Sequence, residues 1–101
     1  MSRPKGGYIV GATVTFELRI AKPGTKTPYD PATVIISSMT LNGVAVTIPG
    51  GGVFTKISQG DWTYNMDTSS LAPGTYKVTM KMSDGPTATV LLSDSFVLNA
   101  P

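Results

Sequence analysis

The sequence predicts an all-β protein, an antiparallel sandwich of two sheets with seven or eight strands. Apolar and polar residues alternate with a period of two over several segments, and no segment repeats its apolar residues at helical spacing. Such alternation is typical of strands with one buried and one wet face. Turn-forming residues separate the segments at roughly the 8–12-residue intervals typical of sandwiches. The length of 101 residues allows one domain. We expect residues 8–101 to form it and residues 1–7 to form an N-terminal arm.

Three segments carry the clearest alternation, namely residues 12–20, 61–67 and 76–82. The residues predicted to face the core are Ala12, Val14, Phe16, Leu18 and Ile20 in the first, Trp62, Tyr64 and Met66 in the second, and Tyr76, Val78, Met80 and Met82 in the third. Weaker strands are predicted at residues 8–10, 33–41, 44–48, 53–57 and 87–98.

The predicted turns follow from particular residues between these strands. Asn42-Gly43 is the dipeptide that a two-residue type I′ hairpin prefers. The sequence Ser-Asp-Gly-Pro at residues 83–86 predicts a second hairpin. We expect the Pro-Gly-Gly-Gly segment at residues 49–52 to be the most flexible loop, because three glycines cost the most entropy to order.

One motif determines the predicted architecture, a corner formed by Leu71, Pro73, Gly74 and Tyr76. A corner between two sheets exposes backbone polar groups, and a tyrosine at the start of the next strand can bond one of them while its ring packs in the core. This Leu-x-Pro-Gly-x-Tyr form resembles the corner of fibronectin type III-like domains. The resemblance implies an immunoglobulin-like sandwich.

The resemblance extends over most of the chain. The motifs Gly-x-x-Val-x-Phe-x-Leu at residues 11–18 and Gly-Asp-Trp-x-Tyr at residues 60–64 precede the corner. Together they resemble bacterial and bacteriophage immunoglobulin-like modules, which implies adhesion, spacing or assembly. Antibody-like recognition does not carry over, because the chain has no cysteine and Trp62 lies just before the corner.

Composition argues against catalysis. The chain has no His and no Cys, so it offers no thiol nucleophile, no Ser-His pair and no disulfide. Its carboxylates are few, and Asp61 and Asp67 lie about 20 Å apart along one strand at ~3.4 Å per residue. That separation is too large for a glycosidase pair. Asp30 and Asp84 are expected in turns. We therefore predict that the chain is not an enzyme.

We also expect no cofactor and no metal. Calcium needs no His, but no loop is dense in oxygen ligands, and Asp94 beside Ser93 and Ser95 is a weak substitute. The glycine-rich segment has no Lys-Ser/Thr and opens no helix, so it is not a phosphate loop. Trp62, Tyr64 and Tyr76 share the inward parity, which favours core packing over sugar stacking.

Partners other than proteins are not expected. Eight basic residues stand against six acidic ones, for a net charge of +2, and they are scattered singly rather than clustered as nucleic-acid binding needs. No apolar run approaches the roughly 18 residues of a membrane span. Residues 1–7 carry Arg3 and Lys5 with no apolar stretch behind them, so we expect no secretory signal. A small unsignalled gene product and a module of a longer secreted protein both remain open.

A protein interface is predicted on one sheet. Val-Ile-Ile at residues 34–36 and Val-Leu-Leu at residues 90–92 interrupt the alternation and place apolar side chains on both faces. We assign Ile35 and Leu91 to the outer face, beside Lys77 and Lys81 of the strand between them. A bulge near Thr33 or Ser93 that turns these residues inward is the alternative. The arm with Arg3 and Lys5 is a second candidate contact.

These observations predict a non-catalytic protein that works by binding a large assembly or by forming a homo-oligomer. From the resemblance we expect a bacteriophage virion accessory, either a capsid decoration or cement protein or a neck or tail component. It would be made in the host cytoplasm and located in the virion. The alternative is an adhesion or spacer module of a secreted bacterial surface protein, located outside the cell.

Overall fold

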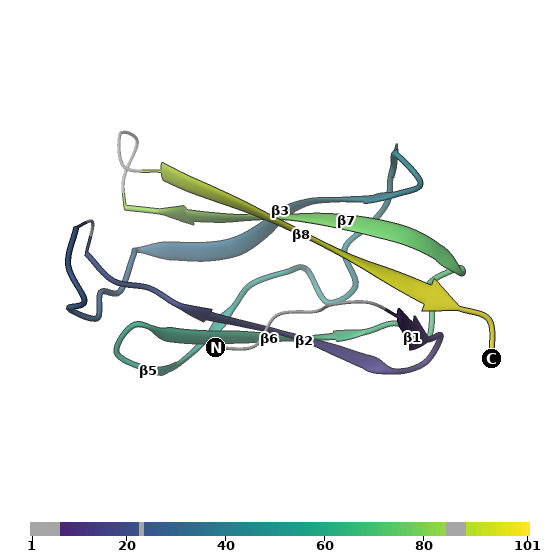
Figure 1. The fold of residues 1–101 in the computed structure, drawn as a ribbon, viewed down its shortest axis with the longest axis horizontal. Helices are drawn as coiled ribbons and strands as arrows, with labels where there is room; N and C mark the ends of the chain where they lie inside the picture. The colour runs from purple at the N-terminus through teal and green to yellow at the C-terminus, as the bar shows by residue number, and fades with distance from the viewer. Residues whose placement is uncertain (1–6, 23, 85–88) are drawn as a thin grey trace.

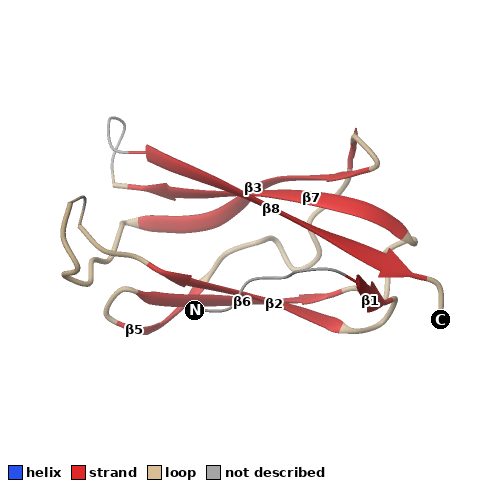
Figure 2. Ribbon diagram, viewed as in Figure 1, coloured by secondary structure: helices blue, strands red, loops and turns tan. Residues whose placement is uncertain are grey.

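The computed structural model describes residues 7–22, 24–84 and 89–101, whose strands form two layers (Figure 1). The strands are β1 (Gly7–Ile9), β2 (Thr13–Arg19), β3 (Thr33–Leu41), β4 (Val44–Ala45), β5 (Thr55–Ser58), β6 (Asp61–Asp67), β7 (Gly74–Ser83) and β8 (Thr89–Asn99). One sheet has the order β1-β8-β7-β3-β4 and the other the order β2-β6-β5. The described residues contain no helix (Figure 2). The prediction of an all-β protein with two sheets is confirmed.

The core lies between the sheets and follows the predicted alternation. Val14, Phe16 and Leu18 of β2 are buried, and so is every second residue of β7 from Tyr76 to Met82. The Phe96 ring of β8 is central, because it stacks on Tyr76 at 5.3 Å and meets Phe16 edge-on at 6.2 Å. These rings join the two sheets.

The antiparallel expectation is wrong at one pair of strands. β1 runs parallel to β8, with Gly7 opposite Val97 and Ile9 opposite Asn99. Alternation along a strand reports which face is buried and carries no information on the direction of its neighbour, so the sequence pattern did not predict this pair. Gly7 already belongs to β1, which shortens the predicted arm by one residue, and the rest of the arm lies outside the described residues.

The strand predicted at residues 44–48 is shorter in the structure. Only Val44 and Ala45 of the predicted strand at residues 44–48 pair with β3, after the expected hairpin at Asn42 and Gly43. Both turn residues have the positive φ, 49° and 87°, that a type I′ turn requires.

The predicted corner hydrogen bond is present. The Tyr76 hydroxyl donates to the Ala72 carbonyl at 2.6 Å, while the Tyr76 ring is 1% exposed. Gly74, between Ala72 and Tyr76 in the sequence, has a φ of 148°, and a Cβ at this position would lie only 2.5 Å from Leu41 Cδ1. The position therefore favours glycine. Leu71 is half-buried against the core and Pro73 is exposed. The corner therefore sets where β7 begins.

The glycine-rich segment, expected to be the most flexible loop, is hydrogen-bonded on several sides. The Tyr64 hydroxyl donates to the Pro49 carbonyl and accepts from the Gly52 N–H at 3.2 Å. Gly52 also accepts from the Ile36 N–H at 2.8 Å. Its φ is 82°, and a Cβ would stand 3.0 Å from Ile36 Cβ, so only glycine fits. These bonds direct the following residues along β3.

We predict that Tyr76→Phe lowers the free energy of unfolding by about 1–2 kcal/mol, because the Ala72 carbonyl loses its partner at a packed corner. Thermal unfolding should shift down by about 4–8 °C per kcal/mol. Tyr8→Phe is the matched control, since Tyr8 is half-buried and its ring also packs against Phe96, at 6.1 Å. Equal melting temperatures for Tyr76→Phe and the wild type would contradict the role given to the corner.

Candidate interaction face

The outer face of the five-stranded sheet, here called the lysine face, is defined by the residues that alternate with the core. Val34, Val78 and Met80 point inward and are buried, so their strand neighbours point outward. The outward residues include Ile35 of β3, Lys77 and Lys81 of β7 and Leu91 of β8. The structure therefore brings four of the predicted interface residues to one face.

Four side chains form a row across this face. Val53 bridges to Ile35, Ile35 pairs with Lys81, and Lys81 pairs with Leu91. Directly opposed residues on neighbouring strands have Cβ atoms about 4.5–5.5 Å apart. Val53 is 67% exposed and Leu91 61% exposed, whereas Ile35 and Lys81 are half-buried. We call Val53, Ile35, Lys81 and Leu91 the cross-strand row.

The alternative of an inward-turning bulge does not hold. β3 has a bulge between Ile36 and Ser38, beyond Ile35, and it leaves Val34 and Ile36 in the core. The register between β7 and β8 is unbroken from the Gly74–Leu98 pair to the Ser83–Thr89 pair. Ile35 and Leu91 consequently keep the outward parity.

The rest of the lysine face is rich in hydroxyl groups. Thr79 Oγ1 and Ser93 Oγ lie 3.5 Å apart next to the row, and Lys77 pairs with Thr40 and Ser95. Among the described residues of these strands, none of the outward side chains is a carboxylate. The only outward charges of this face in that part of the chain are the two lysines.

The outer face of the three-stranded sheet, here called the carboxylate face, has the opposite charge. β2 contributes Glu17 and Arg19, and β6 contributes Asp61 and Asp67. Thr15 Oγ1 donates to Asn65 Oδ1 at 2.9 Å between the charged positions. Three carboxylates thus stand against one arginine on this face.

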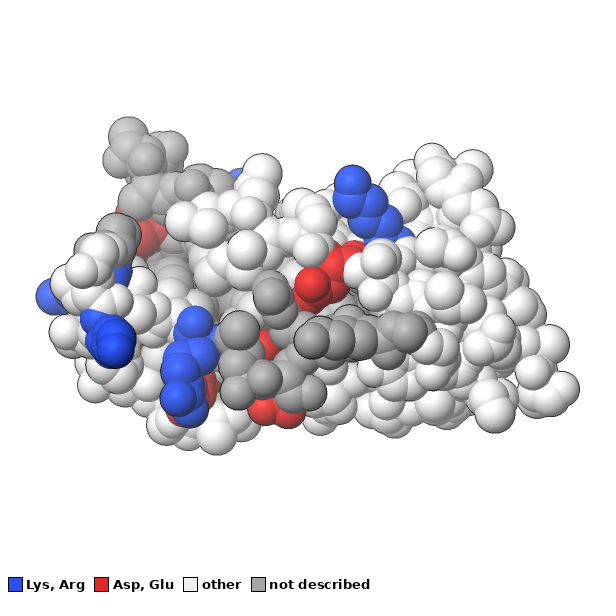
Figure 3. Space-filling model, in the orientation of Figure 1, with Lys and Arg blue, Asp and Glu red and all other residues white. Residues whose placement is uncertain are grey.

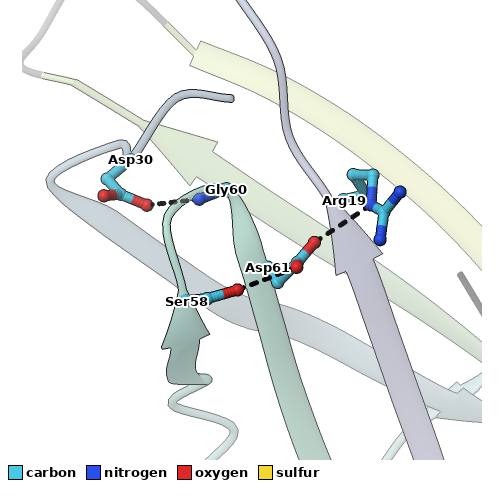
Figure 4. A network of polar contacts seen from close by, with 5 residues as sticks. All are labelled: Arg19, Asp30, Ser58, Gly60 and Asp61. Carbon is cyan, nitrogen blue, oxygen red and sulfur yellow. Dashed lines mark hydrogen bonds and ion pairs between the residues drawn. The ribbon is translucent and has the colours of Figure 1, made fainter. Parts of the chain in front are cut away.

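Two aspartates order the turn between β5 and β6 (Figure 4). Asp61 accepts from Ser58 Oγ at 2.9 Å and from Arg19 Nε at 3.1 Å, and these bonds lower the pKa of Asp61. Asp30 accepts from the Gly60 N–H at 2.8 Å. We expected Asp30 only as a turn residue; its carboxylate instead holds a second turn that is distant in the sequence.

The same aspartate carries an ion pair. Lys56 Nζ lies 2.7 Å from Asp30 Oδ2, with the two side chains 50% and 26% exposed. The pKa of Asp30 is lowered mainly by the hydrogen bond from the Gly60 N–H and secondly by the contacts with Lys56. A half-exposed pair of this kind contributes little stability on its own, so its main effect is to position the β5–β6 turn.

That turn borders a hollow of about 300 Å³ in which the charged residues surround an apolar one. Glu17, Arg19 and Asp61 line the hollow together with Ile57, which is 66% exposed. Leu18 and Trp62 also line it. A second hollow, of about 330 Å³, lies beside the tyrosine corner and is lined by Leu41, Val46, Leu71 and Tyr76 among others.

Charge is sparse on the visible side of the molecule, where uncharged side chains dominate and the few charged side chains form small groups, some with red beside blue (Figure 3). No cluster of metal-binding side chains occurs in the part of the chain that the structure describes. Within the same residues, no helix has the length and apolar character needed to cross a membrane. The predicted contacts Arg3 and Lys5 lie outside the described residues.

No protein-family model matches the chain, and the comparisons with curated proteins and with solved structures gave no match either.

Two residues of these surfaces were absent from the sequence-based prediction. Val53 and Ile57 both fall in the weak strand predicted at residues 53–57, but they lie on opposite sheets. The chain passes from one sheet to the other between them. The signal available in the sequence was the apolar residues at positions 53, 54 and 57, and we took residues 53–57 for a single strand.

We predict a specific acid sensitivity of the β5–β6 turn. The folded-state pKa of Asp30 lies below its ordinary value of 3.8, so the unfolded chain takes up the proton first as the pH falls. The stabilisation is complete above pH 3.8 and is lost as the pH falls through the folded-state pKa. Asp30→Asn, measured by urea unfolding between about pH 5 and pH 2, should show a shallower loss of stability than the wild type.

Asp84→Asn removes one carboxylate at an exposed position after β7 and is the matched control. Identical slopes for Asp30→Asn and the wild type would contradict the assigned role of Asp30.

Proposed function

We propose that the chain is a non-catalytic structural protein with an immunoglobulin-like fold that works by assembly through the lysine face. We further propose that it is an accessory component of a bacteriophage virion, either a capsid decoration or cement protein or a neck or tail component. Its partners are then proteins of the particle or further copies of itself, and it needs no cofactor.

The strand order supports the immunoglobulin-like part of this proposal. Immunoglobulin-like sandwiches place strands G, F and C in one sheet and B, E and D in the other, and variable-type domains add C′ beside C. The orders β8-β7-β3-β4 and β2-β6-β5 correspond to G-F-C-C′ and B-E-D. The tyrosine corner at the start of β7 is in the position that strand F requires.

The observation that carries the functional proposal is the cross-strand row. Val53 and Leu91, each with about two thirds of its surface in water, stand at the two ends of the row, and the half-buried Ile35 and Lys81 lie between them. Burial of such a side chain contributes about 1.5–3 kcal/mol when it is complete. Large exposed apolar patches usually mark contact sites. Here Val53 and Ile35 are adjacent and Leu91 lies on the other side of Lys81, so a partner that covers the row removes apolar surface from water.

The proposal predicts where the protein is found. Particles induced from the strain that encodes the chain should band in a density gradient together with the chain, detected by quantitative mass spectrometry. Recovery of the chain only in the cell-wall or secreted fractions would contradict the virion assignment and support the alternative of a surface adhesion or spacer module.

A second prediction concerns the attachment face. Leu91→Asp should reduce incorporation into particles by more than about tenfold, because losing one buried leucine costs over 1.4 kcal/mol of binding. The melting temperature should stay within a few degrees of the wild type, because Leu91 is 61% exposed. Val44→Asp is the matched control, since Val44 is 68% exposed but lies on β4, away from the row. Equal incorporation of the two variants would contradict attachment through this face.

A further inference from the structure

We infer that the occupant of the lysine face is the carboxylate face of a second copy of this chain, with Leu91 of one copy seated in the hollow beside Ile57 of the next. This inference deepens the proposed function, on which it rests for the lysine face as the contact surface. It names the partner of that face.

Charge complementarity is the first argument. The outward charges of the lysine face, in the described strands, are Lys77 and Lys81 alone. The carboxylate face has Glu17, Asp61 and Asp67 against the single Arg19. Two lysine faces repel each other, and so do two carboxylate faces. Contact between unlike faces is therefore the arrangement that the charges favour.

Shape complementarity is the second argument. Leu91 and Val53 stand out from the lysine face, whereas the carboxylate face has a hollow of about 300 Å³ that exposes Ile57. An enclosed cavity of about 150 Å³ already admits benzene, so the hollow has room for a leucine side chain. Seating Leu91 there removes both Leu91 and Ile57 from water.

The spacing of the charges fits the same arrangement. Lys81 is directly opposite Leu91, about 5 Å away across the strands. Glu17 and Asp61 line the hollow from neighbouring strands and are diagonal neighbours, about 7–8 Å apart. When Leu91 of one copy enters the hollow, its own Lys81 comes within reach of Glu17 and Asp61 of the other copy.

The two faces lie on opposite sides of the sandwich, as the layers in Figure 1 show. Each copy in the proposed contact therefore keeps its second face open for another copy. A heterologous contact of this kind produces a ring when the rotation between copies closes and a filament when it does not. Self-association should accordingly extend beyond a dimer as the protein concentration rises.

Sedimentation velocity on the purified chain at low ionic strength tests the proposed contact with two variants. Leu91→Asp disrupts the lysine face and Ile57→Asp disrupts the carboxylate face. Wild type should form species larger than a dimer at millimolar concentration, and added salt should reduce them because it screens the lysine–carboxylate pairs. Leu91→Asp and Ile57→Asp should each remain at the monomer mass. A one-to-one mixture of the two should double that mass and go no further, because only one intact lysine face meets one intact hollow.

Circular dichroism and the melting temperature verify that both variants are folded, and both changed side chains are more than half exposed. A wild type that stays monomeric at millimolar concentration would overturn the inference, and so would a mixture that stays monomeric. Self-association that Leu91→Asp abolishes and Ile57→Asp leaves intact would also overturn it, by indicating that two like faces meet. None of these outcomes concerns the particle fraction, so the virion proposal stands or falls separately.

Discussion

The register of β7 is the constraint on which the other features depend. β7 is paired along its length, with β8 on one side and β3 on the other. Tyr76 donates a hydrogen bond to the Ala72 carbonyl and stacks on Phe96, and these contacts fix the start of β7 in the core. Side chains alternate between the two faces of a strand. A register slip of one residue would therefore turn Lys77 and Lys81 into the core and expose Tyr76, Val78 and Met80. The corner thus decides both the core and the charge of the outer face.

The low charge of the chain reflects how the outer face of the five-stranded sheet is composed. Only 14% of the residues are charged, and the outward positions of the five-stranded sheet are mostly Ser and Thr with two lysines. Hydroxyl groups keep a face soluble while adding less desolvation cost than charges when that face is covered. Two of the three carboxylates of the other sheet, Glu17 and Asp61, line the hollow beside Ile57. The lysine face carries positive charge and protruding aliphatic side chains, whereas the carboxylate face carries negative charge and a hollow. Contact between unlike faces is favoured for both reasons.

Local patterns were enough to predict part of this structure. Alternation predicted β2, β6 and β7 with their inward residues, and the Asn42-Gly43 dipeptide predicted its hairpin. For Ile35 and Leu91 the sequence left two alternatives open, the outer face or a bulge that turns them inward, and the structure places both on the outer face. Long-range pairing was not accessible in the same way. The bond from Asp30 to Gly60, the bonds from Tyr64 around Gly52, the bridge from Val53 to Ile35 and the parallel β1–β8 pair all join segments whose own sequences do not encode the partner. Since Val53 and the hollow at Ile57 depend on those pairings, local sequence could not predict the full composition of the lysine face and the carboxylate face.

Zero-length carbodiimide cross-linking tests the central claim, contact between the lysine face and the carboxylate face, most directly. The reagent joins a lysine to a carboxylate only when the two are in contact, and Lys81 lies on the opposite side of the sandwich from Glu17 and Asp61. A cross-link from Lys81 to either carboxylate must therefore join two copies. We expect Lys81–Glu17 or Lys81–Asp61 peptides in the fraction larger than the monomer, identified by mass spectrometry. Cross-linked oligomers that contain neither peptide would contradict the claim.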